Sequence, residues 1–255
     1  MKTSLFSFLF ITFVSVINAQ IATPDVYTTK KGDLKIQPLL HASMVLTWDT
    51  KTIYVDPSGL EDLDFKLAKA DVVFITDIHG DHLNVTSLKQ VITPKTILVM
   101  PLAAKLKLKK ANLANKIIVL RNTQTTKVNG IRVSAIAMYD LPESDNSKHV
   151  KGRGNAYVLN MGGKRVYISG DTAGIDEMRE LKNIDIAFVC MNLPYTMTVD
   201  KAASAVLDFK PSIVYPFHYR GKDGFSDVNR FKKLVNTDNK NIKVLLKNWY
   251  PKTLK

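Results

Sequence analysis

The sequence predicts an α/β fold of two similar halves. If their strands stack with helices on both outer faces, the result is a four-layer αββα sandwich, but periodicity alone does not establish how the halves face each other. Two observations lead to this prediction. Each half of the chain opens with adjoining strand-like runs and continues with alternating strands and helices, so that the halves are similar. Residues 20–255 contain no low-complexity tract or Pro/Gly-rich linker that would divide them. They are therefore expected to form one domain.

Apolar or alternating runs, separated by turn-forming residues, predict that the first half begins with adjacent strands. These strands are expected at residues 34–40, 43–49 and 51–57. The pattern that follows predicts a brief helix at 64–70, a buried strand at 71–76, a helix at 84–92 with Asn84 as its N-cap, a strand at 95–100 and a basic helix at 102–112. The first half thus combines a meander with strand–helix units.

Two hairpin signals open the second half. Asn129-Gly130 joins the runs 123–128 and 131–139, and Gly162-Gly163 joins 155–161 to 164–170. Helices are then expected at 175–183, 199–209 and 226–236, alternating with strands at 184–192, 212–219 and 242–248. The second half repeats the order of the first.

The first 19 residues have the composition of a secretory signal peptide. An early lysine is followed by an apolar run from Leu5 to Val16, and Ala19 provides a small residue for cleavage before Gln20. The alternative is an uncleaved membrane anchor, for which the apolar run is short. Cleavage after Ala19 predicts a secreted or periplasmic protein without a transmembrane segment. The single cysteine, Cys190, predicts a protein without internal disulfides.

The chain is strongly basic, with a formal net charge of +13. Residues 95–132 contain nine Lys or Arg residues and no Asp or Glu. One interpretation is a solvated face that keeps the protein soluble; the other is attraction to an anionic envelope surface, polysaccharide or nucleic acid. No aromatic residue interrupts the segment, so a base-stacking platform is not indicated, and no dedicated nucleic-acid module is recognisable.

The stretch FITDIHGDHLN, residues 74–84, brings four candidate ligands into six positions directly after a predicted buried strand: Asp77, His79, Asp81 and His82. Gly80 allows the backbone to bend between them. Loops that leave one edge of a sheet converge, and a metal site needs converging imidazole and carboxylate groups. The stretch therefore predicts a metal site at a sheet edge.

The remaining histidines and one aspartate extend this prediction. His41 and His149 fall in predicted loops, His218 follows the apolar run SIVYPF near the end of the strand expected at 212–219, and Asp171 follows the run 164–170. None of the five histidines lies in the middle of a predicted strand or helix. This arrangement favours a shared metal centre over isolated polar histidines.

The order of these residues resembles that of the metallo-β-lactamase superfamily, in which a His-x-His-x-Asp-His loop is followed by a histidine, an aspartate and a final histidine. The corresponding residues here are Asp77-Ile78-His79-Gly80-Asp81-His82, then His149, Asp171 and His218. Two stretches, HASMVLTWDTKTIYVDPSG and GKRVYISGDT, look most similar to the branch that includes ascorbate-phosphate lactonase-like proteins and the phospholipase D that cleaves N-acylated phosphatidylethanolamine. The resemblance implies an αββα sandwich of the metallo-β-lactamase type and a metal-dependent hydrolase.

The resemblance also implies two divalent metal ions, with zinc expected first and Mn or Fe as alternatives. Carried over residue by residue, the ligands of one ion would be Asp77, His79 and His149, those of the other Asp81, His82 and His218, and the bridge between them Asp171. Asp77 stands where the family most often has histidine. A carboxylate is a harder ligand than imidazole, which favours Mn or Fe beside Zn, or a weaker first site. Asp145 is an alternative to His149 in the same loop.

The implied reaction is metal-assisted hydrolysis of a small-molecule ester, lactone or phosphoester, because two ions lower the pKa of a shared water and so provide hydroxide at neutral pH. Asp81 is the catalytic candidate, since it could orient that water or accept its proton. Asp56 either accepts an N–H from a ligand histidine or starts an Asp-Pro turn. His41, Tyr195 and Arg220 are candidates for contact with the substrate, each with simple packing as its alternative.

A different class of function also fits the composition. If Asp77 marks a decayed site, the chain would be a basic module that binds anionic polymer or an envelope surface without catalysis. The retention of the other candidate ligands argues against this hypothesis. Metal content separates the two hypotheses.

Overall fold

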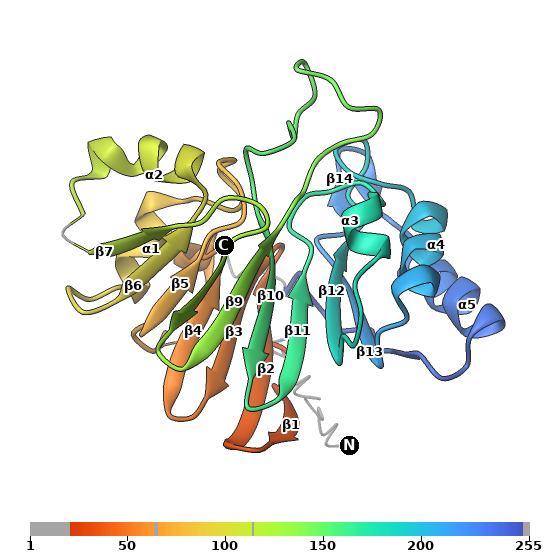
Figure 1. The fold of residues 1–255 in the computed structure, drawn as a ribbon, viewed down its shortest axis with the longest axis horizontal. Helices are drawn as coiled ribbons and strands as arrows, with labels where there is room; N and C mark the ends of the chain where they lie inside the picture. Colours follow the sequence, from red (N-terminus) through yellow and green to blue (C-terminus); the bar gives the residue numbers. More distant parts are fainter. Residues whose placement is uncertain (1–20, 64–65, 114, 252–255) are drawn as a thin grey trace, which may run out of the picture.

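Two seven-stranded sheets form the centre of the computed structural model, which describes residues 21–63, 66–113 and 115–251 (Figure 1). The expected signal peptide lies outside the described residues. Within the described part of the chain, no helix has both the length and the apolar composition needed to cross a membrane.

The first sheet contains its strands in chain order. They are β1 (Asp25–Thr29), β2 (Gly32–Leu40), β3 (Ser43–Trp48), β4 (Lys51–Val55), β5 (Val72–Phe74), β6 (Ile97–Met100) and β7 (Lys116–Val119). The pairs from β1 to β4 are antiparallel, and those from β4 to β7 are parallel. Parallel strands place their carboxyl ends at one edge, which brings the loops after β4 and β5 together.

The second sheet has the same division into antiparallel and parallel parts. In spatial order its strands are β16 (Lys243–Val244), β13 (Ile213–Phe217), β12 (Ile186–Cys190), β11 (Lys164–Ile168), β10 (Ala156–Met161), β9 (Ile131–Ile136) and β8 (Thr125–Val128). β8 to β11 are antiparallel neighbours, whereas β11, β12, β13 and β16 are parallel. A small hairpin, β14 (Arg220–Gly221) and β15 (Gly224–Phe225), follows β13.

Helices cover the outer faces of both sheets, which confirms the four-layer αββα prediction. Figure 1 shows α1 (Val85–Val91) and α2 (Leu102–Leu108) outside the first sheet, and α3 (Asp176–Arg179), α4 (Val199–Phe209) and α5 (Val228–Asp238) outside the second. Short 3-10 turns occupy Leu60–Asp62 and Lys109–Ala111. The Asn84 side chain accepts a hydrogen bond from Ser87 N–H, as expected of the N-cap of α1.

Two hydrophobic clusters hold the layers together, and single strands contribute to both. Ile53 belongs to the cluster between the sheets, whereas Tyr54 packs in the cluster under α1 and α2. Likewise, Val72 belongs to the cluster between the sheets and Val73 to the cluster under α1 and α2. Because successive side chains point to opposite faces of a strand, a strand covered on both faces is apolar throughout.

Several predicted elements differ from the structure. No helix forms in the described part of 64–70, because the amides of Ala70 and Asp71 donate to Val91 and Thr52 of neighbouring elements. The helix expected at 175–183 shrinks to α3, and the final strand shrinks to β16. The sequence analysis also missed β1 and β7, which are half-buried edge strands with weak patterns.

Candidate metal centre

The predicted ligands meet where loops leave the carboxyl ends of strands from both sheets. Asp77, His79, Asp81 and His82 follow β5, Asp171 follows β11 and His218 follows β13. His149 lies in the long loop between β9 and β10, which rises above the sheets in Figure 1. The tertiary structure thus gathers residues from five separate segments, once His41 of the β2–β3 turn is included.

Asp77, His79 and His149 form the first ligand cluster. Their ligand atoms lie within 4.8 Å of one another. His79 Nδ1 contacts Asp77 Oδ2, and His149 Nε2 lies 4.0 Å from the same oxygen. Asp145, the alternative to His149, is exposed, whereas His149 is buried. The geometry therefore favours His149 over Asp145.

His82, Asp171 and His218 form the second cluster. His218 Nε2 lies 3.0 Å from Asp171 Oδ1, and His82 Nε2 lies 3.4 Å from Asp171 Oδ2. His149 Nε2 also approaches Asp171 Oδ2, at 3.2 Å. Asp171 thus touches both clusters, which is the position that a bridging carboxylate requires.

Asp81 lies at the rim of the second cluster rather than inside it. Its side chain is 41% exposed, compared with 3% for Asp171. Asp81 Oδ2 lies 3.5 Å from His218 Nε2 and 3.4 Å from His41 Nε2. The structure therefore brings Asp81 to the second cluster, as the sequence predicts, and adds His41 beside it.

Two carboxylates, the buried Asp56 and the partly buried Asp140, orient two of the candidate ligand histidines. Asp56 accepts His82 Nδ1–H at 2.8 Å, so it fills the supporting role that the sequence suggested. Asp56 also accepts Thr76 N–H at 2.7 Å. Asp140 holds His149 in the same manner, with 3.0 Å to Nδ1 and 2.8 Å to the backbone amide. The sequence analysis missed Asp140, although its place directly after the run 131–139 parallels that of Asp56 after β4.

Positive backbone φ angles recur around the centre. His218, Asp56 and His41 have φ values of 47°, 44° and 59°. L-residues with a side chain rarely adopt this left-handed conformation, and such strain of about 1–3 kcal/mol persists only where surrounding contacts enforce it. Left-handed residues also occur in turns elsewhere in the described chain, but at these three positions the enforced conformation helps to aim side chains at the clusters.

In the two clusters, burial disfavours the charged forms of Asp77, His149 and His82, and neighbouring groups of opposite charge shift their pKa values back toward the charged form. Burial would raise the pKa of Asp77, but the close contact with His79 lowers it to about 2. Burial would lower the pKa of His149, but the neighbouring carboxylates of Asp140 and Asp171 raise it to about 9. For His82, coulombic attraction to Asp171 and Asp56 outweighs burial and raises the pKa well above 6.5. The imidazoles of His82 and His149 and the Arg153 guanidinium, 3.5 Å from Asp77 Oδ1, therefore offset the negative charge of the buried carboxylates.

The donor set fits divalent metal ions. Among the described residues, five buried cluster atoms have no hydrogen-bond partner: Asp77 Oδ1, His79 Nδ1, His149 Nε2, Asp171 Oδ1 and His218 Nδ1. Native structures rarely leave buried polar atoms unsatisfied. Imidazole nitrogens and carboxylate oxygens that converge in this way are the usual ligands of Zn, Mn and Fe.

A pocket of about 240 Å³ opens onto the clusters. Tyr195 and Arg220 line it, as expected, together with Lys148 and Lys222, which the sequence analysis did not single out. Lys148 Nζ lies 3.7 Å from the centre of the Tyr195 ring. The pocket is therefore lined both by residues of the ligand clusters and by positively charged side chains.

Comparisons with known proteins agree with this geometry. Residues 35–218 match a family model described as a beta-lactamase superfamily domain. A UPF0173 metal-dependent hydrolase of Thermoplasma acidophilum is 32% identical over 204 residues, which cover 73% of this chain and 84% of the relative.

Solved structures show the same similarity. A crystal structure of a protein from Parabacteroides distasonis, named as a metal-dependent hydrolase, is 36% identical, with a TM-score of 0.79 and coverage of 89% of this chain and 98% of that one. A metallo hydrolase from Ignicoccus hospitalis shares the fold at 23% identity, with a TM-score of 0.69 and coverage of 86% and 95%.

Proposed function

The chain belongs to the beta-lactamase superfamily and is a metal-dependent hydrolase, and we propose that it uses two divalent ions to cleave an ester, lactone or phosphoester bond in a small anionic molecule. One observation carries the proposal. Asp171 lies between two clusters of metal-binding side chains, within 3.4 Å of imidazole nitrogens from both.

The first ion would be held by Asp77, His79 and His149, and the second by His82 and His218, with Asp171 shared between them and Asp81 beside the second. When bound, two such ions lower the pKa of a shared water and polarise the bond under attack. Each cluster offers two imidazoles, which suit zinc, and the carboxylates beside them make Mn or Fe the alternatives.

The remaining residues of the centre have separate tasks in this proposal. Asp81 is exposed enough to meet a substrate and accepts a proton at its free oxygen. His41 Nε2 lies 3.4 Å from Asp81 Oδ2 and helps to position that carboxylate, while His41 Nδ1 is 2.8 Å from the Tyr250 hydroxyl. Burial and the neighbouring His218 lower the pKa of His41 to about 4. His41 is therefore neutral at physiological pH and adds no positive charge that would repel a metal ion.

The rim of the pocket favours an anionic substrate. Lys148, Arg220 and Lys222 line it, and none of the three forms an ion pair with another described residue. Arg220 is held in place because its backbone N–H donates to Tyr250 Oη at 2.9 Å. A phosphate or carboxylate on the substrate would pair with these cations, which supports phosphoesters and carboxylate-bearing lactones as the compounds to test first.

Metal analysis of protein purified without chelator tests the proposal. We expect about two equivalents of metal in the wild type, because two ligand clusters are present. Asp77→Ala should lose mainly the first equivalent and His82→Ala mainly the second, whereas Asp238→Ala, an exposed carboxylate distant from the clusters in sequence, should keep both. Hydrolysis of anionic and neutral esters, lactones and phosphodiesters is then compared in the same proteins.

Wild-type protein that neither contains metal nor takes up Zn or Mn on titration would overturn the proposal and favour the non-catalytic basic module. Two bound ions together with equal rates on anionic and neutral substrates would contradict only the assigned substrate class.

The leader-like residues 1–19 lead us to propose, in addition, that the enzyme works outside the cytoplasm. N-terminal sequencing of protein from the native host should begin at Gln20. An intact amino terminus in a cytoplasmic fraction would contradict this proposal.

A further inference from the structure

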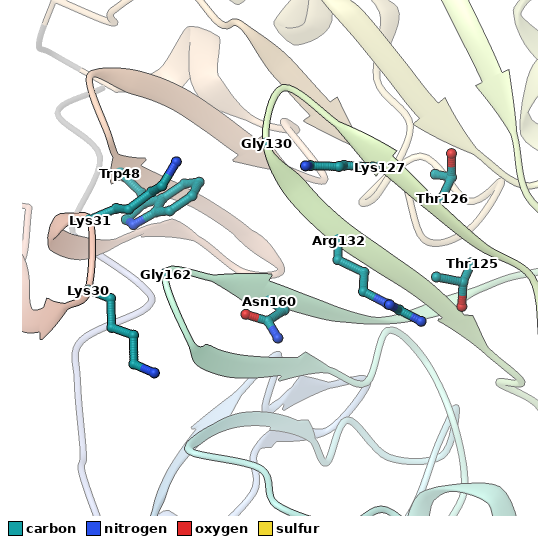
Figure 2. A pocket seen from close by; sticks show the side chains of 10 residues that line it. All are labelled: Lys30, Lys31, Trp48, Thr125, Thr126, Lys127, Gly130, Arg132, Asn160 and Gly162. Carbon is teal, nitrogen blue, oxygen red and sulfur yellow. The ribbon is translucent and has the colours of Figure 1, made fainter.

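We propose that the end of the sandwich opposite the metal clusters carries a second binding site, for an acidic polysaccharide. A concave surface of about 820 Å³, called here the basic groove, occupies this end (Figure 2). Its lining residues are Lys30, Lys31, Trp48, Thr125, Thr126, Lys127, Gly130, Arg132, Asn160 and Gly162. Figure 2 shows Lys30 and Lys31 on one side, Lys127 and Arg132 on the other, and Asn160 between them.

The basic groove is separate from the metal centre because it lies at the other ends of the same strands. Arg132 stands near the start of β9, and the loop that follows β9 carries Asp140 and His149. Six strand residues at about 3.3 Å each place roughly 20 Å between these two ends. The Gly162-Gly163 turn precedes β11, whereas Asp171 follows it. A ligand in the groove therefore does not occupy the catalytic pocket.

The positively charged side chains of the groove lie along one concave surface and form no ion pairs with described carboxylates. Lys127 on β8 is directly opposite Arg132 on β9, and Arg132 is directly opposite Asn160 on β10. Like charges directly opposite on neighbouring strands destabilise a sheet. No described carboxylate forms an ion pair with Lys127, Arg132, Lys30 or Lys31. An anionic ligand along this row would relieve the repulsion that the folded chain tolerates.

The other lining groups favour a polysaccharide over a nucleic acid. Trp48 is only 2% exposed and donates its Nε1–H to Thr29, so it offers no open ring face on which a base could stack. Asn160 adds a neutral hydrogen-bonding group between the cations and Thr126 adds another beyond Lys127 (Figure 2), and both suit sugar hydroxyls. Neighbouring strands are about 4.8 Å apart, so a linear chain lying across β8, β9 and β10 meets successive side chains of the row.

The groove also gives the basic segment 95–132 a more specific interpretation. Lys127 and Arg132 belong to that segment, whereas its α2 lysines lie on the outer face of the first sheet, where Lys107 donates to the Ile78 carbonyl. The segment is therefore divided between two surfaces. Lys30 and Lys31, far away in the sequence, complete the cationic lining.

Binding of defined oligosaccharides to the full-length protein tests the inference. Heparin fragments present sulfate groups and oligogalacturonate presents carboxylates, so the two ligands distinguish the possible anions. We expect saturable binding of at least one of them, weakened at least tenfold in Lys127→Gln/Arg132→Gln. The slope of log affinity against log salt should be shallower by about 2, because two fewer counter-ions are released.

The matched control is Lys105→Gln/Lys109→Gln, which removes two exposed charges from α2 and its following turn but none from the groove. This control should bind within about twofold of the wild type. Thermal unfolding provides a check on folding, because Lys127→Gln/Arg132→Gln removes a like-charge pair and should unfold at the same or a higher temperature.

Equal weakening in both double variants would show general attraction by net charge and overturn the assigned site. Tighter binding of single-stranded DNA or of phosphatidylglycerol vesicles than of either oligosaccharide, through the same two residues, would overturn the assigned ligand class. Hydrolysis by the groove variants should match that of the wild type, which separates failure of this inference from failure of the proposed enzyme.

Discussion

Asp56 is a buried carboxylate that supports the metal centre at the scale of single residues. It accepts hydrogen bonds from Thr76 N–H and from Thr76 Oγ1–H as well as from His82. With His82 Nδ1 engaged in this way, Nε2 is the atom that faces Asp171. Such a partner fixes both the ring orientation and the tautomer of a ligand histidine.

The substitution Asp56→Asn tests this role, since it keeps an acceptor oxygen but removes the charge. We expect zinc affinity to fall about 10–100-fold, the range found when partners of metal ligands are replaced. Competition with a chromogenic chelator measures the affinity, and Asp238→Asn is the control because that carboxylate is exposed. Unchanged affinity in a folded Asp56→Asn protein would show that the carboxylate only anchors the turn.

At the scale of elements, the turn after β11 is held by close packing around Gly170. This glycine has a φ of +57°, and a Cβ placed on it would lie 2.8 Å from Met138 Sδ and 3.0 Å from Thr76 Cβ. The next residue is Asp171, which touches both ligand clusters. The absence of a side chain at position 170 therefore lets the loops from both sheets approach each other.

Gly170→Ala should lower the free energy of unfolding by about 1–3 kcal/mol through overpacking, beyond the cost of its positive φ. Gly152→Ala is a matched control, because Gly152 has a φ of +83° but nothing within 4 Å of an added Cβ. Denaturant titration of both variants isolates the effect of the close contact. Equal losses would mean that the loop simply moves aside.

At the scale of the whole molecule, the proposed metal centre predicts that metal binding, proton release and stability are coupled. The pKa of His149 is raised from 6.5 to about 9, and a raised pKa stabilises the fold fully below 6.5 and progressively less as the pH rises through about 9. A metal ion must displace the proton from this imidazole before it can bind. Metal affinity should therefore increase as the pH rises toward 9.

The stabilisation produced by zinc should accordingly be larger at about pH 8.5 than at about pH 6.5 when the free zinc concentration is held constant with a metal buffer. Thermal unfolding with and without zinc measures it. His149→Gln should show a smaller change with pH, because it removes one of the protons to be displaced. A zinc-induced shift that decreases with rising pH would contradict the assigned coupling.

The local patterns were enough to predict most of the architecture. The hairpin turns at Asn129-Gly130 and Gly162-Gly163, most of the apolar strands and the amphipathic helix α4 appear where periodicity placed them. The sequence analysis failed where tertiary bonds override a weak local preference, as at residues 66–70, or where an edge strand carries little pattern, as in β7.

By itself, the sequence determined the alternation of strands and helices in two similar halves and the set of candidate ligands, because periodicity, turn chemistry and side-chain type are local properties. Only the tertiary structure decided how those ligands divide. It placed Asp171 between the clusters and Asp81 at the rim, chose His149 over Asp145, and added Asp140. It also joined Lys30 to Arg132 across one groove. These outcomes depend on distances between segments far apart along the chain, which packing of the two sheets sets and local pattern does not record.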